Sequence, residues 1–545
     1  MSGRDAMIRR SRVLFIAIAS TFLIASATAQ DSKQAARYGT ANFPVSCNNE
    51  AQQLFNLAVT ILHSFEFATA EKVLIAVAEK DSACAMAYWG IALGSRRNPI
   101  SNVPNAAALK KAWAAVERAK AMGARTERER DYIAAIETFY KNADERDHAA
   151  RSIAYEQAME RVYLKYPDDR EAAVFYALAL LPNEQTVSTD KTYAKLLKAG
   201  EILERIFVEQ PDHPGIAHYI IHTYDHPALA SRALPAARKY DQIAPSSQHA
   251  LHMPSHIYTR LGLWQDSIKS NLAAARVARE NALKNNPGAT VATPLHMLQF
   301  LMEAYLQVAE DEKAKGVLDE LNAGYAGKPE RLGRAIMRAG IPARYAVERR
   351  RWSEAASLQP LSSSFHYAEA ITYFARATGA ARSGNAAAAR KDLEMIRSQR
   401  DAALQAKLNY WAQEIEILRL SAAGWLARAE GKIEDAIRLL RASAVLEDST
   451  LQHHTARDPI VPAREMLGDL LIEVGQPEQA LREFEISLER HPNRFNGLYG
   501  AGRAAELSGA REKAKSFYAQ LMEACGNADT GRPELQWARA LLASK

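Results

Sequence analysis

The stretch GDLLIEVGQPEQALREFEISLERHPNRFNGLYGAGRAAELSGAREKAKSFY, residues 468–518, contains one pattern twice. Four positions recur 34 residues apart, and the matching pairs are Gly468 with Gly502, Gly475 with Gly509, Ala480 with Ala514, and Phe484 with Tyr518. Small residues at fixed places in a 34-residue period are typical of the tetratricopeptide repeat (TPR), a hairpin of two antiparallel helices. The stretch therefore predicts two consecutive helical hairpins.

Each small residue in this pattern has a packing role. The first glycine lets the two helices of a hairpin approach closely, the second glycine ends the first helix, and the alanine occupies the helix crossing. Related positions upstream are Trp352, Ala355, Gly384, Ala389, Gly431, Ala436 and Leu440. We therefore expect residues 343–545 to form a C-terminal TPR array.

One spacing in this array departs from the period. Ala436 and Ala480 are 44 residues apart. The roughly ten extra residues, which include His453, His454 and Pro459, predict a loop between two repeats. Insertions of this kind tend to gather on one face of a repeat array, which is often the face that binds a partner.

The region over residues 30–342 repeats less regularly but has the same character. Residues 51–94 fit one hairpin, and residues 110–123, 127–142 and 149–164 have the periodicity of amphipathic helices. No alternating β-branched run of the kind that predicts a strand is present. We expect an all-α protein whose TPR-like helical hairpins stack into a right-handed superhelix.

Residues 1–29 have the features of a cleaved export signal. Four arginines precede the apolar run Val13–Ala25, and Ala27-Thr28-Ala29 matches the small-x-small cleavage site. Thirteen apolar residues are too few to cross a bilayer, which takes about twenty, and no later stretch is longer. We expect cleavage after Ala29, a periplasmic or secreted mature chain, and no membrane span in it.

Charge and motifs exclude several classes of function. The formal net charge is +6, and it falls to +3 when the leader with its four arginines and Asp5 is removed. A chain of this length with interspersed charges of both signs gives no reason to expect nucleic acid or an anionic membrane as a partner. It also has no phosphate-binding loop, nucleophile elbow or CxxC pair, so we expect no nucleotide cofactor and no metal-free catalytic site of these kinds.

The chain has three cysteines, Cys47, Cys84 and Cys525. Export places them in an oxidising compartment, where disulfides form. Cys47 and Cys84 flank the first predicted hairpin, whose path out and back brings its ends together. We therefore predict a Cys47–Cys84 disulfide and a lone, partly buried thiol at Cys525.

Histidines concentrate in one part of the chain. Seven of the fourteen lie between His213 and His256, in PDHPGIAHYIIHTYDHP and APSSQHALHMPSHIYTRLG. Asp212 can cap a helix that starts near Pro214, and this helix would place His218, His222 and Asp225 on one face. His249, His252 and His256 also have helical spacing, although a helix that starts at Pro254 would leave His249 and His252 in the turn before it.

These histidines have a structural and a functional interpretation. A single histidine such as His63, His296 or His366 is more often packed against a tyrosine or bonded to a carbonyl, and His213 fits a turn. Two triplets with helical spacing favour a transition-metal site, for which imidazole and carboxylate ligands suit zinc, copper or iron. The candidate ligands are His218, His222, Asp225, His249, His252 and His256.

Six strings of the sequence resemble a family of exported bacterial TPR proteins, in the same order and over almost the whole mature chain. They are FPVSC, ILHSFEFATAEKV, CAMAYWGIAL, PDHPGIAHYIIHTYDHP, HALHMPSHIYTRLGLW and PAREMLGDLLIEVGQPEQAL. The resemblance implies a TPR fold and export, and it implies little about activity. The family tends to carry an Asp-Tyr pair after the position of His296, where this chain has Gln299-Phe300.

The sequence leaves three functions open. The first is a scaffold that binds a protein or peptide in the concave groove of its repeats. The second is a metal-binding protein in which His218, His222, His252 and His256 hold one ion or a close pair, with Asp225 as a ligand or as the acceptor that orients an imidazole. The third is an enzyme that uses the same metal with one coordination position open to water.

Overall fold

The computed structural model describes residues 38–100, 103–181, 190–288, 291–325, 331–450 and 459–544. The predicted export signal over residues 1–29 and the loop residues His453 and His454 lie outside these ranges.

The described part of the chain consists of helices and their connections, without a strand, which confirms the predicted all-α class. The first thirteen helices are α2 (Asn49–His63), α3 (Phe67–Lys80), α4 (Ala85–Ser95), α5 (Ala106–Met122), α6 (Glu127–Tyr140), α7 (His148–Lys165), α8 (Arg170–Ala179), α9 (Ala194–Glu209), α10 (Pro214–Thr223), α11 (Ala230–Ile243), α12 (Gln248–His252), α13 (Pro254–Arg260) and α14 (Trp264–Asn285). The others are α15 (Leu295–Gln307), α16 (Asp311–Gly324), α17 (Leu332–Glu348), α18 (Trp352–Ala356), α19 (His366–Arg382), α20 (Ala386–Gln405), α21 (Asn409–Ala429), α22 (Ile433–Ser449), α23 (Ala463–Glu473), α24 (Pro477–Arg490), α25 (Phe495–Leu507), α26 (Arg511–Ala524) and α27 (Pro533–Ala543). None of these helices has the length and apolar character needed to cross a membrane.

The chain folds into two compact units. Unit 1 comprises Met1–Leu181, Lys198–Ile220 and Lys239–Ala250, and unit 2 comprises Pro182–Leu197, Ile221–Arg238 and Leu251–Lys545. The division falls inside the histidine-rich stretch, whereas the sequence suggested a boundary at residue 342, where the regular repeats begin. Unit 2 contains these repeats together with the helices from α13 onward.

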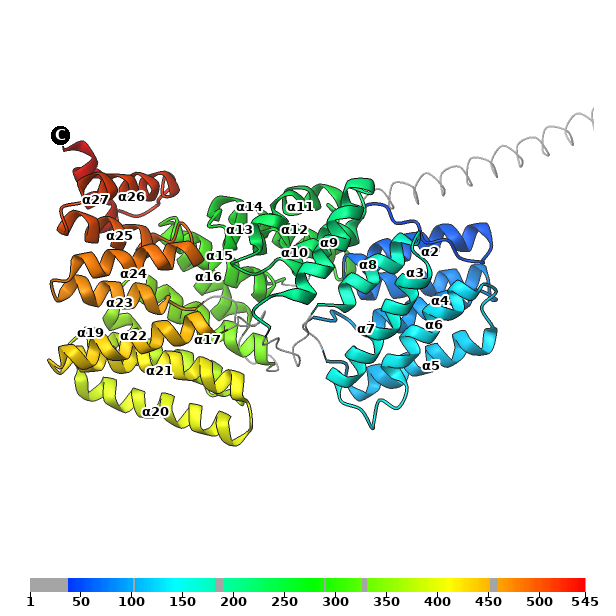
Figure 1. Ribbon diagram of the computed structural model, residues 1–545, viewed down its shortest axis with the longest axis horizontal. Coiled ribbons are helices and arrows are strands. Elements are labelled where there is room, and N and C mark those ends of the chain that lie inside the picture. Colours follow the sequence, from blue (N-terminus) through cyan, green and yellow to red (C-terminus); the bar gives the residue numbers. More distant parts are fainter. Residues whose placement is uncertain are drawn as a thin grey trace, which may run out of the picture. The chain divides into compact units, whose positions relative to one another are not determined.

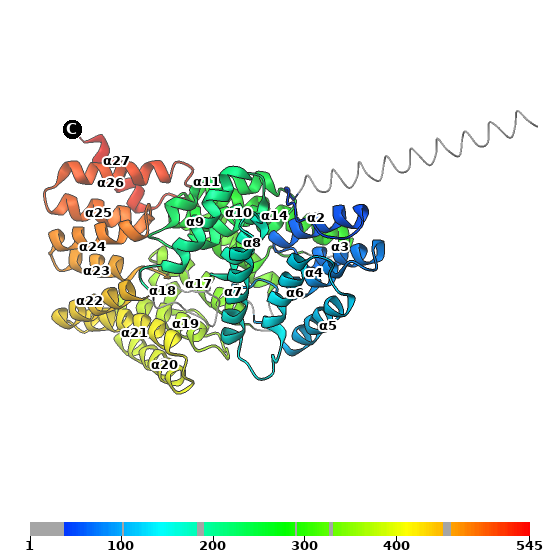
Figure 2. The same ribbon diagram turned by 45° about the vertical axis from the view of Figure 1, so that its right-hand side comes forward.

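Unit 1 is organised around an aromatic core at its N-terminal helices, which Figure 2 shows as neighbouring hairpins. Phe43 is fully buried, and its ring lies 5.5 Å from the ring of Phe55, 5.3 Å from Trp89 and 4.9 Å from Tyr132. A disulfide joins Cys47, which lies just before α2, to Cys84, the residue that precedes α4, with the two Cα atoms 5.1 Å apart.

Unit 2 contains the predicted hairpins, and Figure 1 shows α21 to α27 stacked in sequence order. A Cβ atom added to Gly468 would lie 2.7 Å from the Phe484 ring, and one added to Gly502 would lie 2.6 Å from the ring of Tyr518. Both glycines therefore allow a close helix crossing, as predicted. Gly475 and Gly509 follow the first helix of each hairpin with φ angles of 75° and 80°, which confirms that they end these helices in the left-handed conformation.

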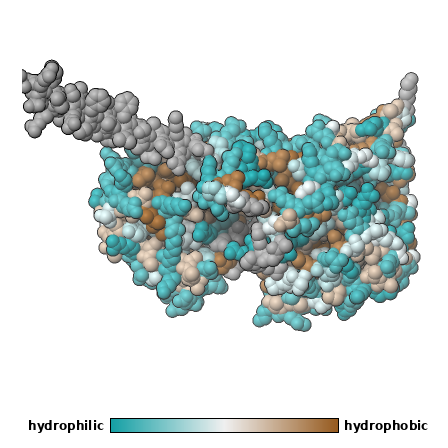
Figure 3. All heavy atoms as spheres, turned by 180° about the vertical axis from the view of Figure 1, so that it is seen from behind, coloured by the Kyte–Doolittle hydropathy of each residue, from teal (hydrophilic) through white to brown (hydrophobic). Residues whose placement is uncertain are grey.

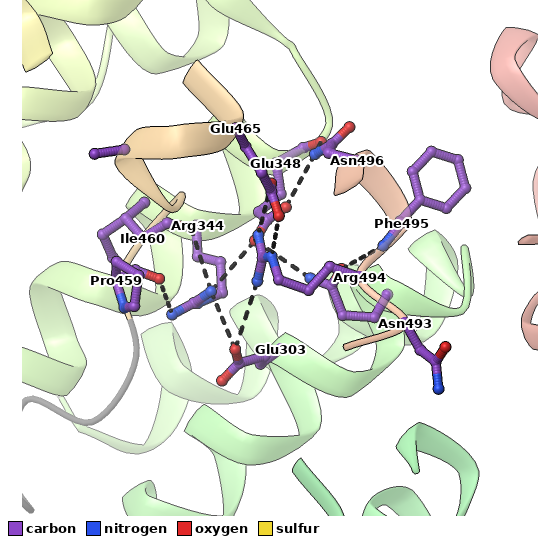
Figure 4. A network of polar contacts seen from close by, with 12 residues as sticks. Glu303, Arg344, Glu348, Pro459, Ile460, Glu465, Asn493, Arg494, Phe495 and Asn496 are labelled. Carbon is purple, nitrogen blue, oxygen red and sulfur yellow. Dashed lines mark hydrogen bonds and ion pairs between the residues drawn. The ribbon is translucent and has the colours of Figure 1, made fainter. Parts of the chain in front are cut away.

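A buried network of charged side chains connects four helices of unit 2, as Figure 4 shows. The Arg494 guanidinium lies before α25 and donates to Glu465 Oε1 of α23 at 2.7 Å and to Glu348 Oε1 of α17 at 2.6 Å. Arg344 of α17 lies 3.4 Å from Glu303 of α15. Burial raises the pKa of Glu465 to about 7. The positive charge of Arg494 opposes this shift, and the negative charge of Glu348 adds to it. Glu348 and Arg494, which are 146 positions apart in the sequence, are thereby held together by an ion pair. Removal of either partner alone would leave a buried charge.

In the space-filling view of Figure 3, hydrophilic residues predominate on the face shown, and hydrophobic ones form separate patches. Cys525 is a buried free thiol, and burial raises its pKa to about 12, which disfavours the thiolate form at neutral pH.

We predict that Gly468→Leu destabilises unit 2 by about 1–3 kcal/mol, because the added side chain must displace the Phe484 ring. The matched control is Gly316→Ala in α16, where an added Cβ meets no atom within 4 Å, and it should be stabilising by about 0.5–1 kcal/mol. Urea unfolding followed by circular dichroism measures both. Equal midpoints for the two variants would contradict the packing role of Gly468.

We also predict that replacing Cys47 and Cys84 by serine lowers the stability of unit 1 by about 3–4 kcal/mol, because the cross-link closes a loop with a sequence separation of 37. Peptide mass mapping of the unreduced protein should find the two residues linked. Free thiols at both positions would reject the disulfide.

Candidate metal centre

The first half of the histidine-rich stretch forms α10, which starts at Pro214 as expected. Its cap differs from the prediction. The backbone N–H of Ile216 donates to His213 Nδ1 at 3.3 Å, while the exposed carboxylate of Asp212 lies 3.3 Å from Lys239 Nζ. The prediction that Asp212 caps this helix is therefore wrong, because the buried imidazole of His213 provides the acceptor instead.

The second half forms two short helices separated at Met253. Pro254 starts α13, so His249 and His252 lie on α12 and His256 lies on α13. The proline has the effect that the sequence indicated.

His63, Glu171 and His213 form a fully buried cluster in unit 1. Since Ile216 donates to Nδ1 of His213, we assign the proton of that ring to Nε2, which lies 2.9 Å from Glu171 Oε1. His63 Nε2 lies 2.9 Å from the other carboxylate oxygen, and Tyr219 Oη lies 2.9 Å from His63 Nδ1. Both imidazoles thus donate to one carboxylate while their second nitrogens accept hydrogen bonds.

The electrostatics of this cluster agree with neutral histidines around an ionised carboxylate. Burial lowers the pKa of His63, and the nearby Glu171 only partly opposes this effect. Burial alone would raise the pKa of Glu171, but the two histidines and their hydrogen bonds outweigh it and hold the pKa well below its usual value. Every ring nitrogen has a suitable partner, so hydrogen bonding accounts for the cluster without a metal.

His218 and His249 form a second histidine pair in unit 1. His218 Nδ1 lies 2.6 Å from the carbonyl oxygen of His63, so it carries the proton, and its Nε2 is an acceptor 3.0 Å from His249 Nε2. An N–H on His249 Nε2 completes an ordinary hydrogen bond. The ring of Phe65 covers the pair, with its centroid 4.4 Å from that of His218 and 5.5 Å from that of His249.

Unit 2 contains a different cluster, formed by His252, His256 and His296. One ring nitrogen of each lies within 4.8 Å of the others. The three residues come from α12, α13 and α15, and His252 and His256 are buried. Helices that are separate in the sequence thus bring three imidazoles to one point.

Neighbouring side chains determine which nitrogen is protonated in two of these rings. His252 Nδ1 lies 2.7 Å from Asn271 Oδ1, and the amide of Asn271 is oriented by its own donation to the carbonyl of Ser267 at 2.8 Å. His256 Nδ1 lies 2.8 Å from Asp225 Oδ2, an oxygen that can only accept. Both rings therefore carry a proton on Nδ1, and in their neutral form they present a lone pair on Nε2.

The two lone pairs face each other. His252 Nε2 and His256 Nε2 are 3.1 Å apart. Two acceptors at this distance repel each other unless a proton or a metal cation lies between or beside them. Two imidazoles on one tetrahedral ion, with metal–nitrogen bonds of about 2.0–2.1 Å, would place their nitrogens about 3.3 Å apart, close to the observed separation.

Phe300 packs against all three rings of this cluster. Its centroid lies 4.9 Å from His252, 4.9 Å from His256 and 5.1 Å from His296. Phe300 is one of the two residues at which the chain departs from the resembling family. The phenyl ring lowers the local dielectric around the imidazoles and excludes water from their shared side.

The other predicted ligands take different places. Asp225 lies beside His256 as an acceptor, and its second oxygen receives the Nε–H of Arg260 at 3.0 Å. The ring of His222 lies 6.3 Å from that of His256. Sequence reasoning grouped His252 with His256 correctly, treated His296 only as a single structural histidine, and missed Asn271, which has no distinguishing motif.

No model of a known protein family matches the chain, and no curated protein is significantly similar to it. Three solved structures are similar to it at low identity. The structure of the APC/C hetero-tetramer Cut9–Hcn1 is 13% identical over 90% of this chain and 89% of that chain, with a TM-score of 0.27. A tetratricopeptide repeat protein from Parabacteroides merdae is 15% identical over 65% of this chain and 98% of its own, with a TM-score of 0.25. The TPR domain of P58(IPK) is 16% identical over 69% of this chain and 98% of its own, with a TM-score of 0.21.

All three TM-scores are below 0.5, so the assignment of TPR-like hairpins rests on the repeat spacing and helix crossings of the chain itself.

We predict that Glu171→Gln lowers the stability of unit 1 by about 2–4 kcal/mol, because the amide cannot accept from both buried imidazoles. The pKa of Glu171 and that of His63 are both lower in the folded state. Their contribution to stability is therefore full above about pH 6.5 and is lost as the pH falls.

Chemical denaturation at pH 7.5 and pH 5 checks both parts of this prediction. Glu171→Gln should lose more stability on acidification than the wild type, because without the carboxylate the pKa of the buried His63 is lowered further. The same loss in both proteins would contradict the role assigned to this cluster.

Proposed function

We propose that this chain is an exported TPR-type protein that binds one divalent transition-metal ion through His252, His256 and His296. The observation that carries the proposal is the opposition of two lone pairs, on Nε2 of His252 and Nε2 of His256, at 3.1 Å. A metal cation bound to both Nε2 atoms would remove the repulsion between their lone pairs. His296 provides the third nitrogen.

The groups behind the ligands support this proposal. Metal-binding imidazoles usually donate their second N–H to a carboxylate or carbonyl-type oxygen, which fixes the tautomer and makes the ring a better ligand. Asp225 and Asn271 occupy these positions behind His256 and His252. Arg260 in turn holds Asp225. The arrangement matches the requirements of a preformed metal site.

The chemistry of the ligands limits the metal to a class. Three imidazoles suit zinc, copper and iron, and the apolar ring of Phe300 disfavours ions that keep many water ligands, such as magnesium and calcium. The wider set of ligands predicted from the sequence, in which His218 and His222 join His252 and His256, is an alternative for the same function.

Export is the second part of the proposal. It is supported by the basic and apolar segments of residues 1–29 and by the Cys47–Cys84 disulfide, since such bonds persist in oxidising compartments. The repeat hairpins of unit 2 support a further role as a scaffold for a protein or peptide partner. A fourth ligand position open to water would make the same ion capable of hydrolytic chemistry.

The test is metal content. The protein, purified without an affinity tag, should contain one ion per chain by plasma mass spectrometry, and His256→Ala should lose it. The matched control is His366→Ala, which removes a histidine whose Nδ1 is bonded to Gln399 in α20, and it should retain the ion. Metal-free wild type, or equal content in His256→Ala, would contradict the proposal and favour the scaffold without metal.

We predict that Asp225→Asn retains the three ligands but binds the metal about 10–100-fold more weakly, because the neutral amide lacks the negative charge that makes the His256 imidazole a stronger ligand. Competition with a chromophoric chelator measures this affinity. An unchanged affinity would show that Asp225 does not act through His256.

A further inference from the structure

Unit 1 contains three basic side chains gathered around one phenyl ring. The guanidinium carbons of Arg96 and Arg151 lie 4.6 Å and 5.0 Å from the centroid of Phe139, and the imidazole of His148 lies 5.6 Å from it. The exposed fractions of Arg96, His148 and Arg151 are 7%, 4% and 3%. Buried arginines normally have a carboxylate partner.

Hydrogen bonding within the described part of the chain leaves polar atoms of His148 and Arg151 unmatched. Both ring nitrogens of His148 and the Nη1 atom of Arg151 are buried and lack a hydrogen-bond partner in the part of the chain that the structure describes. Arg151 donates from Nε to the backbone carbonyl of Asp147 at 3.3 Å. The carboxylate of Asp147 is itself engaged by the backbone N–H of Ala150 at 2.7 Å.

The position of the cluster adds to its positive potential. His148 is the first residue of α7, an 18-residue helix, and Arg151 lies one turn further on. The N-terminus of a helix carries a partial positive charge that attracts anions. The neighbouring Arg146 donates only to backbone carbonyls, those of Thr138 and Ala150.

We propose that Arg96, His148 and Arg151 form a binding site for a small oxyanion, such as the carboxylate or phosphate group of a small molecule. The charge of Arg96 disfavours the buried cation of Arg151, and an oxyanion offsets this repulsion while it accepts the planar, forked donors of Arg151. The same ligand provides the acceptor that Arg151 Nη1 and the His148 ring lack within the described chain.

The pKa shifts of the cluster reflect the burial and mutual repulsion of its basic groups. Burial is the largest cause that lowers the pKa of His148 to about 4; the charges of Arg96 and Arg151 contribute to this shift, and Asp147 opposes it. Burial also lowers the pKa of Arg151, with Arg146 and Arg96 adding to the effect and Tyr140 and Asp147 opposing it. A bound oxyanion would raise the pKa of His148 and stabilise both arginines.

The experiment compares anions at equal ionic strength. The purified protein is exchanged into chloride buffer and then titrated with sodium phosphate or sodium acetate while thermal unfolding of unit 1 is followed. Phosphate or acetate should raise the melting temperature by about 3–8 °C in a saturable manner, and additional chloride should not. The absence of a rise with either oxyanion, or an equal rise with chloride, would overturn the proposal.

Two variants locate the effect. Arg151→Met removes a buried charge, so in chloride it should be at least as stable as the wild type, and it should not respond to phosphate. The matched control Arg118→Met removes an exposed arginine near the ring of Tyr88, and it should respond like the wild type. His148→Gln, which retains a polar side chain, should weaken oxyanion binding about tenfold by calorimetry. Unchanged binding in both Arg151→Met and His148→Gln would also overturn the proposal.

Discussion

The close crossing of two helices at a glycine is the contact on which the rest of unit 2 depends. Gly424, Gly468 and Gly502 each lie under a large side chain sixteen residues later, namely Leu440, Phe484 and Tyr518, at distances that no Cβ could occupy. This contact sets the separation within a hairpin, and its repetition lets hairpins stack with one geometry. Ion pairs such as Arg494 with Glu348 and Glu465 then connect helices that the repeat alone does not join.

Two histidine clusters of similar composition differ in the hydrogen-bond partners of their ring nitrogens. In the cluster around Glu171, one carboxylate accepts from two imidazoles and each ring has a complete set of partners. In the cluster around His252 and His256, Asn271 and Asp225 accept hydrogen bonds from the Nδ1 atoms of the two rings. In the neutral rings both Nε2 atoms, which face each other, are then acceptors. The first arrangement is complete as it stands, whereas in the second a proton or a metal cation must lie between the two Nε2 atoms. Burial and proximity alone would not have distinguished them.

The sequence predicted those features that depend on local spacing. The 34-residue period identified the glycines of the hairpins, and the proline after Met253 indicated where α13 begins. His296 and Asn271 could not be predicted as part of the site, because they reach it through the packing of α14 and α15, which leaves no spacing signal. The weaker repeat signal of residues 30–342 has a structural counterpart as well. Phe65 and Ala309 have positive φ angles just after α2 and α15, at the place where the regular repeats have glycine.

The most direct measurement of the central claim is X-ray absorption spectroscopy of the protein loaded with one equivalent of zinc. The account predicts a first shell that contains three imidazole nitrogens at about 2.0–2.1 Å, with the multiple scattering typical of histidine ligands. In His256→Ala the histidine scattering should decrease or the ion should be lost. A first shell of oxygen atoms without imidazole scattering, or a spectrum that is the same in wild type and His256→Ala, would contradict the account.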